Sequence, residues 1–421
     1  MGGRFVSATG PRSDGGARGT TGLHGGSSTL RGAPPPPRRV CHHPSVADPG
    51  VATAARPTAR GELRGLTALR FVAATMVLLH HQADVSPLPF GLTALGHVGF
   101  VGVDFFFVLS GFVLTWSHRE GQRTTTFWRR RIARVYPLHV VGWFAALGLT
   151  LAHDQRPEPL LAWGLALILV QAWVPRSEWA YSANGVSWSL SCEALFYATF
   201  PWLRPLVARL SVRDTARTGF AVYAVMLLAV VVVRAWNPAA DAGNPGVLYT
   251  DPLYRLGEFA LGIVLARAVA AGWRPRCPAW AALGVTLLAW LTVATVFARL
   301  ASDPDLTRFT GPAAIREIGG LVLLPLLVLV VATVATDERA GTLPRWLGSR
   351  VAVMLGRWSF AFYVVHQLVV HAFEPALPTT TAAQQLVALA VVGAVSLLLA
   401  AVLHHAVEVP LARRWREPPS V

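Results

Sequence analysis

Charged side chains are scarce in this chain of 421 residues, because Asp, Glu, Lys and Arg together make up only 14% of it. Soluble domains carry about 25% charged residues. Hydrophobic residues account for 53% of the chain, and the mean hydropathy is +0.46. This composition is typical of an integral membrane protein and argues against a soluble globular fold.

Cysteine is scarce as well. Cys41, Cys192 and Cys277 lie in three different segments and form no CxxC pair. The sequence therefore predicts neither a disulfide framework nor a metal site. The apolar neighbours of Cys192 favour an inert thiol over a reactive one.

Acidic residues are few, since 22 of them stand against 37 basic residues and give a formal charge of +15. In a soluble protein such a charge would suggest nucleic acid as the partner. Here the arginines gather in short stretches between apolar runs, which suits cytoplasmic loops that face anionic lipid headgroups. We therefore expect the lipid bilayer, and no nucleic acid, as a partner.

The first 60 residues contain no long apolar run and are rich in Gly, Pro, Ser and Arg, including PPPPRR at Pro34–Arg39. Such a segment buries too little surface to fold, so we expect a disordered basic tail over residues 1–60 that stays inside the cell. Without an apolar core region it does not read as a signal peptide. Residues 61–416 are expected to form one membrane domain, and residues 417–421 a short C-terminal tail.

The membrane domain contains about eleven apolar segments, most of which are long enough, at roughly 17–25 residues, to cross a bilayer. They begin near Leu66, Gly91, Leu138, Pro159, Trp188, Gly219, Pro252, Ala279, Gly319, Val351 and Ala383. Two of them, Leu138–Ala152 and Leu160–Val174, are shorter.

Loop charge sets the expected orientation. The arginine-rich stretches Arg119–Arg134 and Arg204–Arg217 read as cytoplasmic, whereas Asn237–Thr250 carries no Lys or Arg and reads as external. Three apolar segments lie between the two cytoplasmic stretches, where parity permits only two crossings. We therefore expect Leu160–Val174 to be re-entrant. The predicted fold is an all-α polytopic bundle of about ten transmembrane helices with both termini in the cytoplasm.

The segment Leu63–Ala83 carries polar groups inside an apolar helix: Arg70 and the pair His80-His81. Arg70 and His81 are eleven positions apart, which places both on one helix face about 16 Å apart along the axis. An arginine at such a depth usually faces protein, water or a counter-ion. The structural alternative is an arginine that extends to the headgroups and a histidine that only forms a hydrogen bond.

The next apolar segment, Gly96–Trp116, places Asp104 near its centre, where a carboxylate must be protonated, paired or in a wet cavity. Small residues on this segment allow close approach of a helix or of a ligand: Gly99, Gly102, Ser110 and Gly111.

Further polar groups recur along the chain. In Phe127–His139, Arg131 and Arg134 share a helix face and would bind either lipid headgroups or a phosphate, and Pro137 is expected to start the next helix. In Asn184–Leu203, Ser189, Ser191 and Glu193 bring polar atoms into a membrane helix. Glu193 would orient a histidine, act as a base or pair with an arginine.

Two later motifs have local interpretations. Arg255 and Glu258 are spaced for an ion pair within one helix, and Ser359, Tyr363 and His366 lie on one strip of another helix. Taken alone, His366 is more often a structural residue.

These motifs, in this order, resemble the acyltransferase-3 family of integral-membrane O-acyltransferases. The resemblance rests on Arg70…His81, GFVGVDFFFVLSGF, RRRIARVYPLH, VSWSLSCEALFY, GRWSFAFYVVH and VEVPLARR. It departs from the family at the doubled histidine, where spacing selects His81, and at Ala194, where many members have a second Glu.

The resemblance implies transfer of an acetyl or other short acyl group from acyl-CoA to a hydroxyl of a carbohydrate, glycolipid or secondary metabolite. Acyl-CoA would be a co-substrate, with no bound cofactor and no metal. His81 would be the catalytic imidazole, oriented by Glu193 or Asp104. The remaining candidates would bind substrate or acyl-CoA: Arg70, Arg131, Arg134, Ser110, Ser189, Ser191, Tyr197 and His366. Arg70 and His81 would line a shared tunnel.

Two other functions fit the same polar residues. A proton-coupled transporter also uses buried Arg, Asp, Glu and His, although no internal repeat is visible here. A non-catalytic membrane scaffold would pair these residues only with one another. Release of free thiol from acyl-CoA distinguishes an acyltransferase from a carrier.

Overall fold

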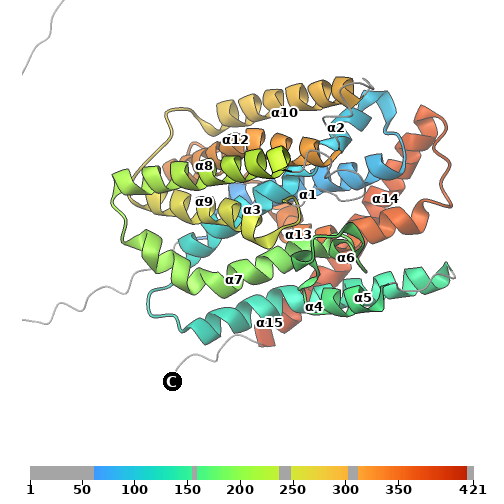
Figure 1. Cartoon of the computed structure of the whole chain (residues 1–421), viewed down its shortest axis with the longest axis horizontal. Coiled ribbons are helices and arrows are strands. Elements are labelled where there is room, and N and C mark those ends of the chain that lie inside the picture. Colours follow the sequence, from blue (N-terminus) through green and yellow to red (C-terminus); the bar gives the residue numbers. More distant parts are fainter. Residues whose placement is uncertain (1–60, 154–158, 237–247, 302–311, 415–421) are drawn as a thin grey trace, which may run out of the picture. The chain divides into compact units, whose positions relative to one another are not determined.

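The computed structural model describes residues 61–153, 159–236, 248–301 and 312–414 (Figure 1). All of them belong to one compact unit, Arg56–Val421. Within these ranges every regular element is helical and none is a strand. The predicted tails, residues 1–60 and 417–421, lie outside the described residues.

Ten of the described helices are long, at 17 to 29 residues. They are α1 (Arg64–Val85), α3 (Val101–Ser117), α4 (Thr124–Ala152), α7 (Ser187–Ala208), α8 (Val212–Trp236), α9 (Pro252–Ala270), α10 (Ala279–Ala301), α12 (Pro312–Ala340), α13 (Arg350–Phe373) and α14 (Ala382–Leu403). Shorter elements connect them: η1 (Pro89–Gly91), α2 (Thr93–His97), α5 (Leu160–Leu167), η2 (Gln171–Trp173), α6 (Ser177–Ala180), the π-helical η3 (His404–Glu408) and α15 (Val409–Arg414).

Six helices among the described residues are long and apolar enough to cross a membrane, and α3 is a shorter apolar helix. The six are α4, α8, α10, α12, α13 and the continuous stretch Ala382–Arg414. Over its described residues the chain is therefore all-helical, with the composition of a multi-pass membrane protein.

Two helix boundaries differ from the sequence-based expectation. Pro137 does not start a helix, because α4 runs unbroken from Thr124 to Ala152 and contains Pro137 in its interior. Arg131 and Arg134 therefore lie on the same helix as the apolar segment that follows Pro137. Asp104 lies in the first turn of α3 and not at the centre of a span. The reason is that the helix is interrupted between the end of α2 at His97 and the start of α3 at Val101.

The segment predicted to be re-entrant is indeed short, since α5 has eight residues and rises only about 12 Å. The last carbonyl groups of a helix lack partners within the helix. At the end of α5 the side chain of His139 lies 3.0 Å from the carbonyl of Ala166 and 3.2 Å from that of Leu167. Two further side chains hold the helix from outside, since Trp143 donates to Trp163 at 3.0 Å and Ser182 donates to Ala162 at 3.1 Å.

Glycines bring the central helices into backbone contact. A methyl group at Gly111 of α3 would overlap the backbone carbonyl of Phe259 in α9, and one at Gly262 of α9 would overlap the carbonyl of Val108 in α3. In the same way Gly356 places α13 directly against α1 at Thr67. Small residues at helix crossings are the usual means of close packing in a membrane.

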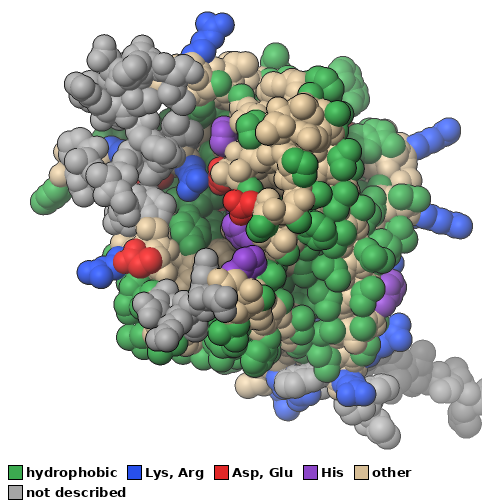
Figure 2. All heavy atoms as spheres, turned by 90° about the vertical axis from the view of Figure 1, so that its right-hand side faces the viewer, with side chains coloured by type: hydrophobic (Ala, Val, Ile, Leu, Met, Phe, Trp, Pro, Cys, Tyr) green, Lys and Arg blue, Asp and Glu red, His purple; other side chains and the backbone are tan. Residues whose placement is uncertain are grey.

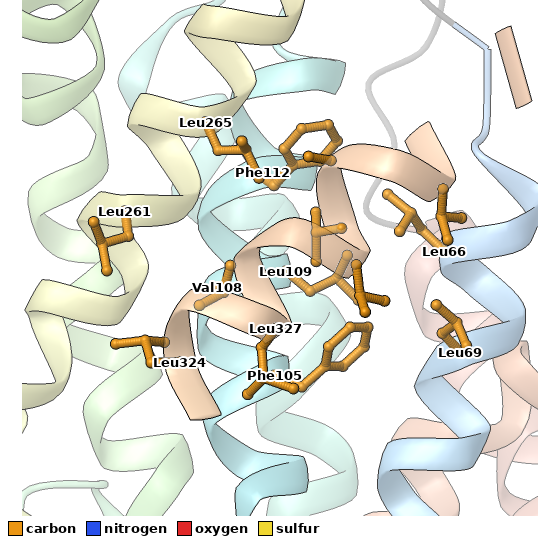
Figure 3. Packing of buried hydrophobic residues seen from close by; sticks show 14 of the residues in the cluster. Leu66, Leu69, Phe105, Val108, Leu109, Phe112, Leu261, Leu265, Leu324 and Leu327 are labelled. Atoms are coloured by element: carbon orange, nitrogen blue, oxygen red, sulfur yellow. The ribbon is translucent and has the colours of Figure 1, made fainter. Parts of the chain in front are cut away.

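A large apolar cluster fills the space between α1, α3, α9 and α12 (Figure 3). Its labelled members include Leu69, Phe105, Leu109 and Leu327, all less than 10% exposed. This packing fixes α1 and α3 relative to each other. It therefore also fixes the polar residues that the two helices carry.

Candidate functional site

A cavity of about 580 Å³, including the part open to solvent, lies beside the C-terminal half of α1. We call it the His81 cavity. Figure 2 shows a hollow with histidine, acidic and arginine side chains gathered around it. The cavity is lined by Val77, His80, His81, Asp84, Phe100, Val103, Tyr181, Trp188, Tyr249, Arg316, Tyr363 and Gln367.

His81 is held by two contacts at one ring nitrogen. Its Nδ1 lies 3.0 Å from the backbone carbonyl of Val77 and 3.0 Å from Nε2 of His366. His366 is fully buried, and its own Nδ1 lies 2.8 Å from the carbonyl of Tyr363. A carbonyl oxygen only accepts, so Nδ1 of His366 carries a hydrogen and Nε2 of the neutral ring is an acceptor.

The tautomer of His81 is determined in the same way, by the groups that its Nδ1 contacts. Because Nδ1 of His81 meets two acceptors, it carries the hydrogen, which leaves a lone pair on Nε2. No described residue forms a hydrogen bond with that Nε2. The arrangement can therefore take a proton from a hydroxyl group in the cavity.

The orienting residue is not the one expected from the sequence. Neither Glu193 nor Asp104 contacts His81, so the expectation that one of them orients this imidazole is wrong. Glu193 accepts a hydrogen bond from the hydroxyl of Tyr197 at 2.7 Å, and Asp104 binds Arg255. His366, which we expected among the substrate-binding residues, holds His81 instead.

Charged groups surround the carboxylate of Asp84 at the edge of the cavity. It lies 3.6 Å from His80, 3.5 Å from His97 and 3.9 Å from Arg316. These residues come from α1, α2 and α12. The Asp84 side chain is 39% exposed and that of Arg316 23% exposed, so this edge is the polar mouth of the His81 cavity.

Arg70, Arg131 and Arg134 form a second polar site, which we call the arginine cluster. Arg134 lies within electrostatic reach of both Arg70 and Arg131, and Glu193 lies within electrostatic reach of all three. Arg134 also faces Glu408, whose carboxylate lies 3.8 Å from its Nε and 2.8 Å from His404. The expected common face of Arg131 and Arg134 is thus present on α4.

The two polar sites are separate in this structure. None of the three arginines lines the His81 cavity. Between Arg70 and His81, Ala74 and Val77 of α1 are at most 1% exposed, and Phe106 of α3 packs against Tyr363 of α13 at 5.9 Å between ring centroids. The His81 cavity therefore does not extend to the three arginines, and it does not form the expected shared tunnel in this structure.

Asp104 belongs to a third group. Arg255 donates to Asp104 at 2.7 Å and also pairs with Glu258, which confirms the local ion pair expected from the sequence. Its Nε donates to the carbonyl of Tyr249 at 2.7 Å, and the guanidinium lies 4.6 Å from the centroid of the Tyr249 ring. Tyr249 lines the His81 cavity, so this buried group supports one cavity wall.

The three candidate serines have different surroundings. Ser189 lies 2.8 Å from the hydroxyl of Tyr363, a cavity residue. Ser191 is fully buried, and its hydroxyl has no partner among the described residues. Ser110 is on α3 and does not line the His81 cavity. Among the described residues, no group of three or more His, Cys, Asp or Glu side chains is arranged to hold a metal ion.

Several cavity residues were missed from the sequence. Tyr181, Tyr249 and Arg316 lie at the ends of helices or in connections that are far apart in the chain. Only Asp84 had a local signal, because it follows His80 by four positions on the same helix.

Comparison with known proteins identifies the family. Residues 63–405 match the acyltransferase domain of the acyltransferase-3 type. Acyltransferase MdmB of Streptomyces mycarofaciens is 35% identical over 376 residues, covering 83% of this chain and 92% of that protein. O-acetyltransferase OatA of Staphylococcus aureus is 28% identical over 188 residues, covering 40% of this chain and 30% of that protein. No solved structure matches.

The matched region contains α1, with Arg70 and His81, and reaches to the π-helical turn at His404. It therefore includes both polar sites and every residue that lines the His81 cavity. This chain belongs to the acyltransferase-3 family and is an acyltransferase of the kind that transfers groups other than aminoacyl groups.

Proposed function

We propose that this protein is an O-acyltransferase that moves an acetyl or other short acyl group from acyl-CoA to a hydroxyl group. The acceptor would be a carbohydrate, a glycolipid or a secondary metabolite. The observation that carries the proposal is the unpaired Nε2 of His81 in a cavity, with Nδ1 fixed by Val77 and His366.

His81 supplies the proton transfer of this reaction. Its Nε2 takes the proton of the acceptor hydroxyl while that oxygen attacks the thioester carbonyl. When the carbon–sulfur bond breaks, the imidazolium returns the proton to the sulfur, and free coenzyme A leaves. An acyl-histidine intermediate would use the same nitrogen and would appear as added mass on the intact protein.

The arginine cluster would hold the phosphates of coenzyme A, since arginine binds phosphate through paired hydrogen bonds. Arg70 and His81 are eleven residues apart on α1, about 16 Å along the axis. A pantetheine arm is about long enough to span this distance. Glu193 and Glu408 face the arginines in the structure. When the donor binds, its phosphates would replace these carboxylates as partners of the arginines.

We further propose ten crossings with both termini in the cytoplasm. Ten described helices have 17 or more residues, and the short α5 leaves an even number of spans. The arginine cluster would then face the cytoplasm, where coenzyme A is found, and the polar mouth would face outward.

A gene deletion with complementation tests the function. Extracts of the deletion strain, compared by mass spectrometry, should lack one acylated compound, and the wild-type gene should restore it. His81→Ala should restore none of it although the variant is folded in detergent by size exclusion. His153→Ala is the matched control, because His153 is exposed at the end of α4. Normal acylation with His81→Ala would overturn the assignment.

The same extracts test the transporter alternative. Membranes with the wild-type protein should release thiol from acetyl-CoA only when the extract of the deletion strain supplies the acceptor. A carrier releases no thiol under any of these conditions, and such a result would refute the acyltransferase proposal.

A further inference from the structure

The His81 cavity has two chemically different parts. The polar mouth consists of partly exposed charged groups, Asp84 and Arg316. The other part, which we call the apolar end, is lined by Val77, Phe100, Val103 and Trp188. Each of these four side chains is at most 4% exposed. All four belong to one hydrophobic core cluster, so the apolar end is backed by packed side chains and not by solvent.

The apolar end directly adjoins the histidines. Val77 precedes His81 by one turn of α1 and binds its Nδ1 through the backbone carbonyl. Phe100 packs edge-on against His80, with 5.8 Å between ring centroids. A thioester carbonyl placed at Nε2 of His81 would therefore have these apolar side chains within reach of its acyl carbons.

The size of this end is set by how closely α3 approaches α1. A methyl group at Gly99 would overlap the carbonyl of Met76, and one at Gly102 would overlap that of Ala73. The backbone of α1 is thus in contact with the stretch from Gly99 to Gly102, and the Val77 side chain lies against Gly102, the residue before Val103. Because neither helix can recede without losing these contacts, the side chain at position 103 decides how much room remains.

We propose that the apolar end is the acyl-chain subsite and that Val103 is its main determinant of chain length. The apolar tail lies against Val77, Phe100 and Val103, whereas the acceptor with its hydroxyl groups occupies the polar mouth. Each methylene of the donor that is buried there strengthens its binding. A tail that reaches past the subsite would lose that gain and would have to displace packed side chains. The inference rests on the proposed acyl transfer.

The test compares acetyl-, propionyl- and butyryl-CoA as donors. Membranes with the full chain receive each donor and the extract of the deletion strain, and thiol release that depends on the extract gives kcat/KM. Val103→Ala removes two methyl groups from the subsite, so the butyryl-to-acetyl ratio of kcat/KM should rise by about tenfold. Val103→Ile adds one carbon and should lower that ratio.

Val101→Ala is the matched control, because Val101 is a buried valine of α3 in the same cluster but does not line the cavity. Its ratio should equal that of the wild type. An unchanged ratio in both Val103 variants, with active wild type, would overturn the subsite and leave the acyltransferase intact. Absence of thiol release from every donor with the wild type would instead refute the proposed function itself.

Discussion

At the scale of single residues, the pair His81 and His366 carries most of the chemical information. Two imidazoles in hydrogen-bond contact have defined tautomers only if an outside group fixes one of them. The carbonyl of Tyr363 does so through Nδ1 of His366. Nδ1 of His366 and Nδ1 of His81 then both carry a hydrogen, and Nε2 of His81 keeps its lone pair.

This arrangement predicts a specific order of activities for variants of His366. His366→Ala removes one of the two acceptors at Nδ1 of His81 and leaves only the carbonyl of Val77. The imidazole is then less firmly oriented, and kcat should fall roughly 10²-fold with KM for acetyl-CoA nearly unchanged. His366→Gln still offers a carbonyl oxygen and should recover part of the loss. Thiol-release kinetics measure both constants. If His366→Gln and His366→Ala were equally impaired, His366 would be a packing residue only.

The sequence predicted the position of His81 on its helix but not the residue that orients it. Spacing along α1 correctly placed Arg70 and His81 on one helix, because helical geometry alone relates them. The contact between His81 and His366 joins residues 285 positions apart, and no local pattern encodes it. The expected partners Glu193 and Asp104 were wrong for the same reason. Nearby cations, Arg255 for Asp104 and the arginine cluster for Glu193, attract these carboxylates elsewhere.

At the scale of helices, the group of Asp104, Arg255 and Glu258 joins α3 to α9. Arg255 is 3% exposed, and one of its nitrogens meets both carboxylates. The outer oxygens of the two acids, Oδ2 of Asp104 and Oε2 of Glu258, have no partner among the described residues. When both acids are ionised, this buried group holds one more negative than positive charge, because a single cation faces two carboxylates.

Replacing the cation of this group should therefore have a different effect on stability from replacing one of its acids. Arg255→Met leaves two buried acids without a cation, which should cost about 3–5 kcal/mol of stability. Glu258→Gln keeps the shape and removes the surplus charge, so the change in stability should be small. Thermal unfolding of the purified variants in detergent measures both. Equal losses would show that Glu258 is needed in its ionised form.

Helix boundaries show where sequence patterns fail at this scale. The run of arginines at residues 129–134 lowers the local hydropathy, so the sequence suggested that one helix face carries Arg131 and Arg134 and that a new helix begins at Pro137. In the structure α4 begins at Thr124, because arginine is a good helix former. Conversely, the length of the apolar run predicted a short segment at Leu160–Val174, and loop parity predicted that it does not span. The side chains that bind the carbonyls of α5 could only be seen in the fold.

At the scale of the whole molecule, the proposed orientation makes a prediction that is independent of activity. Thr380 precedes α14 and Glu120 precedes α4, and both are exposed. In a background without the three native cysteines, Thr380→Cys should react with a membrane-impermeant maleimide in intact cells. Glu120→Cys should react only after lysis. The reverse labelling pattern would invert the topology and place the arginine cluster on the outer side.

The glycine contacts have a consequence for how the donor reaches His81. Backbones already touch between α3 and α9, between α3 and α1, and between α13 and α1. Because these four helices are closely packed through their backbones, none of them can move away from the others without losing contacts. We call this group the rigid frame. A route from the arginines to the imidazole must therefore open by rotation of side chains such as Phe106 and Tyr363, or by displacement of α4 and α7 at the rim of that frame.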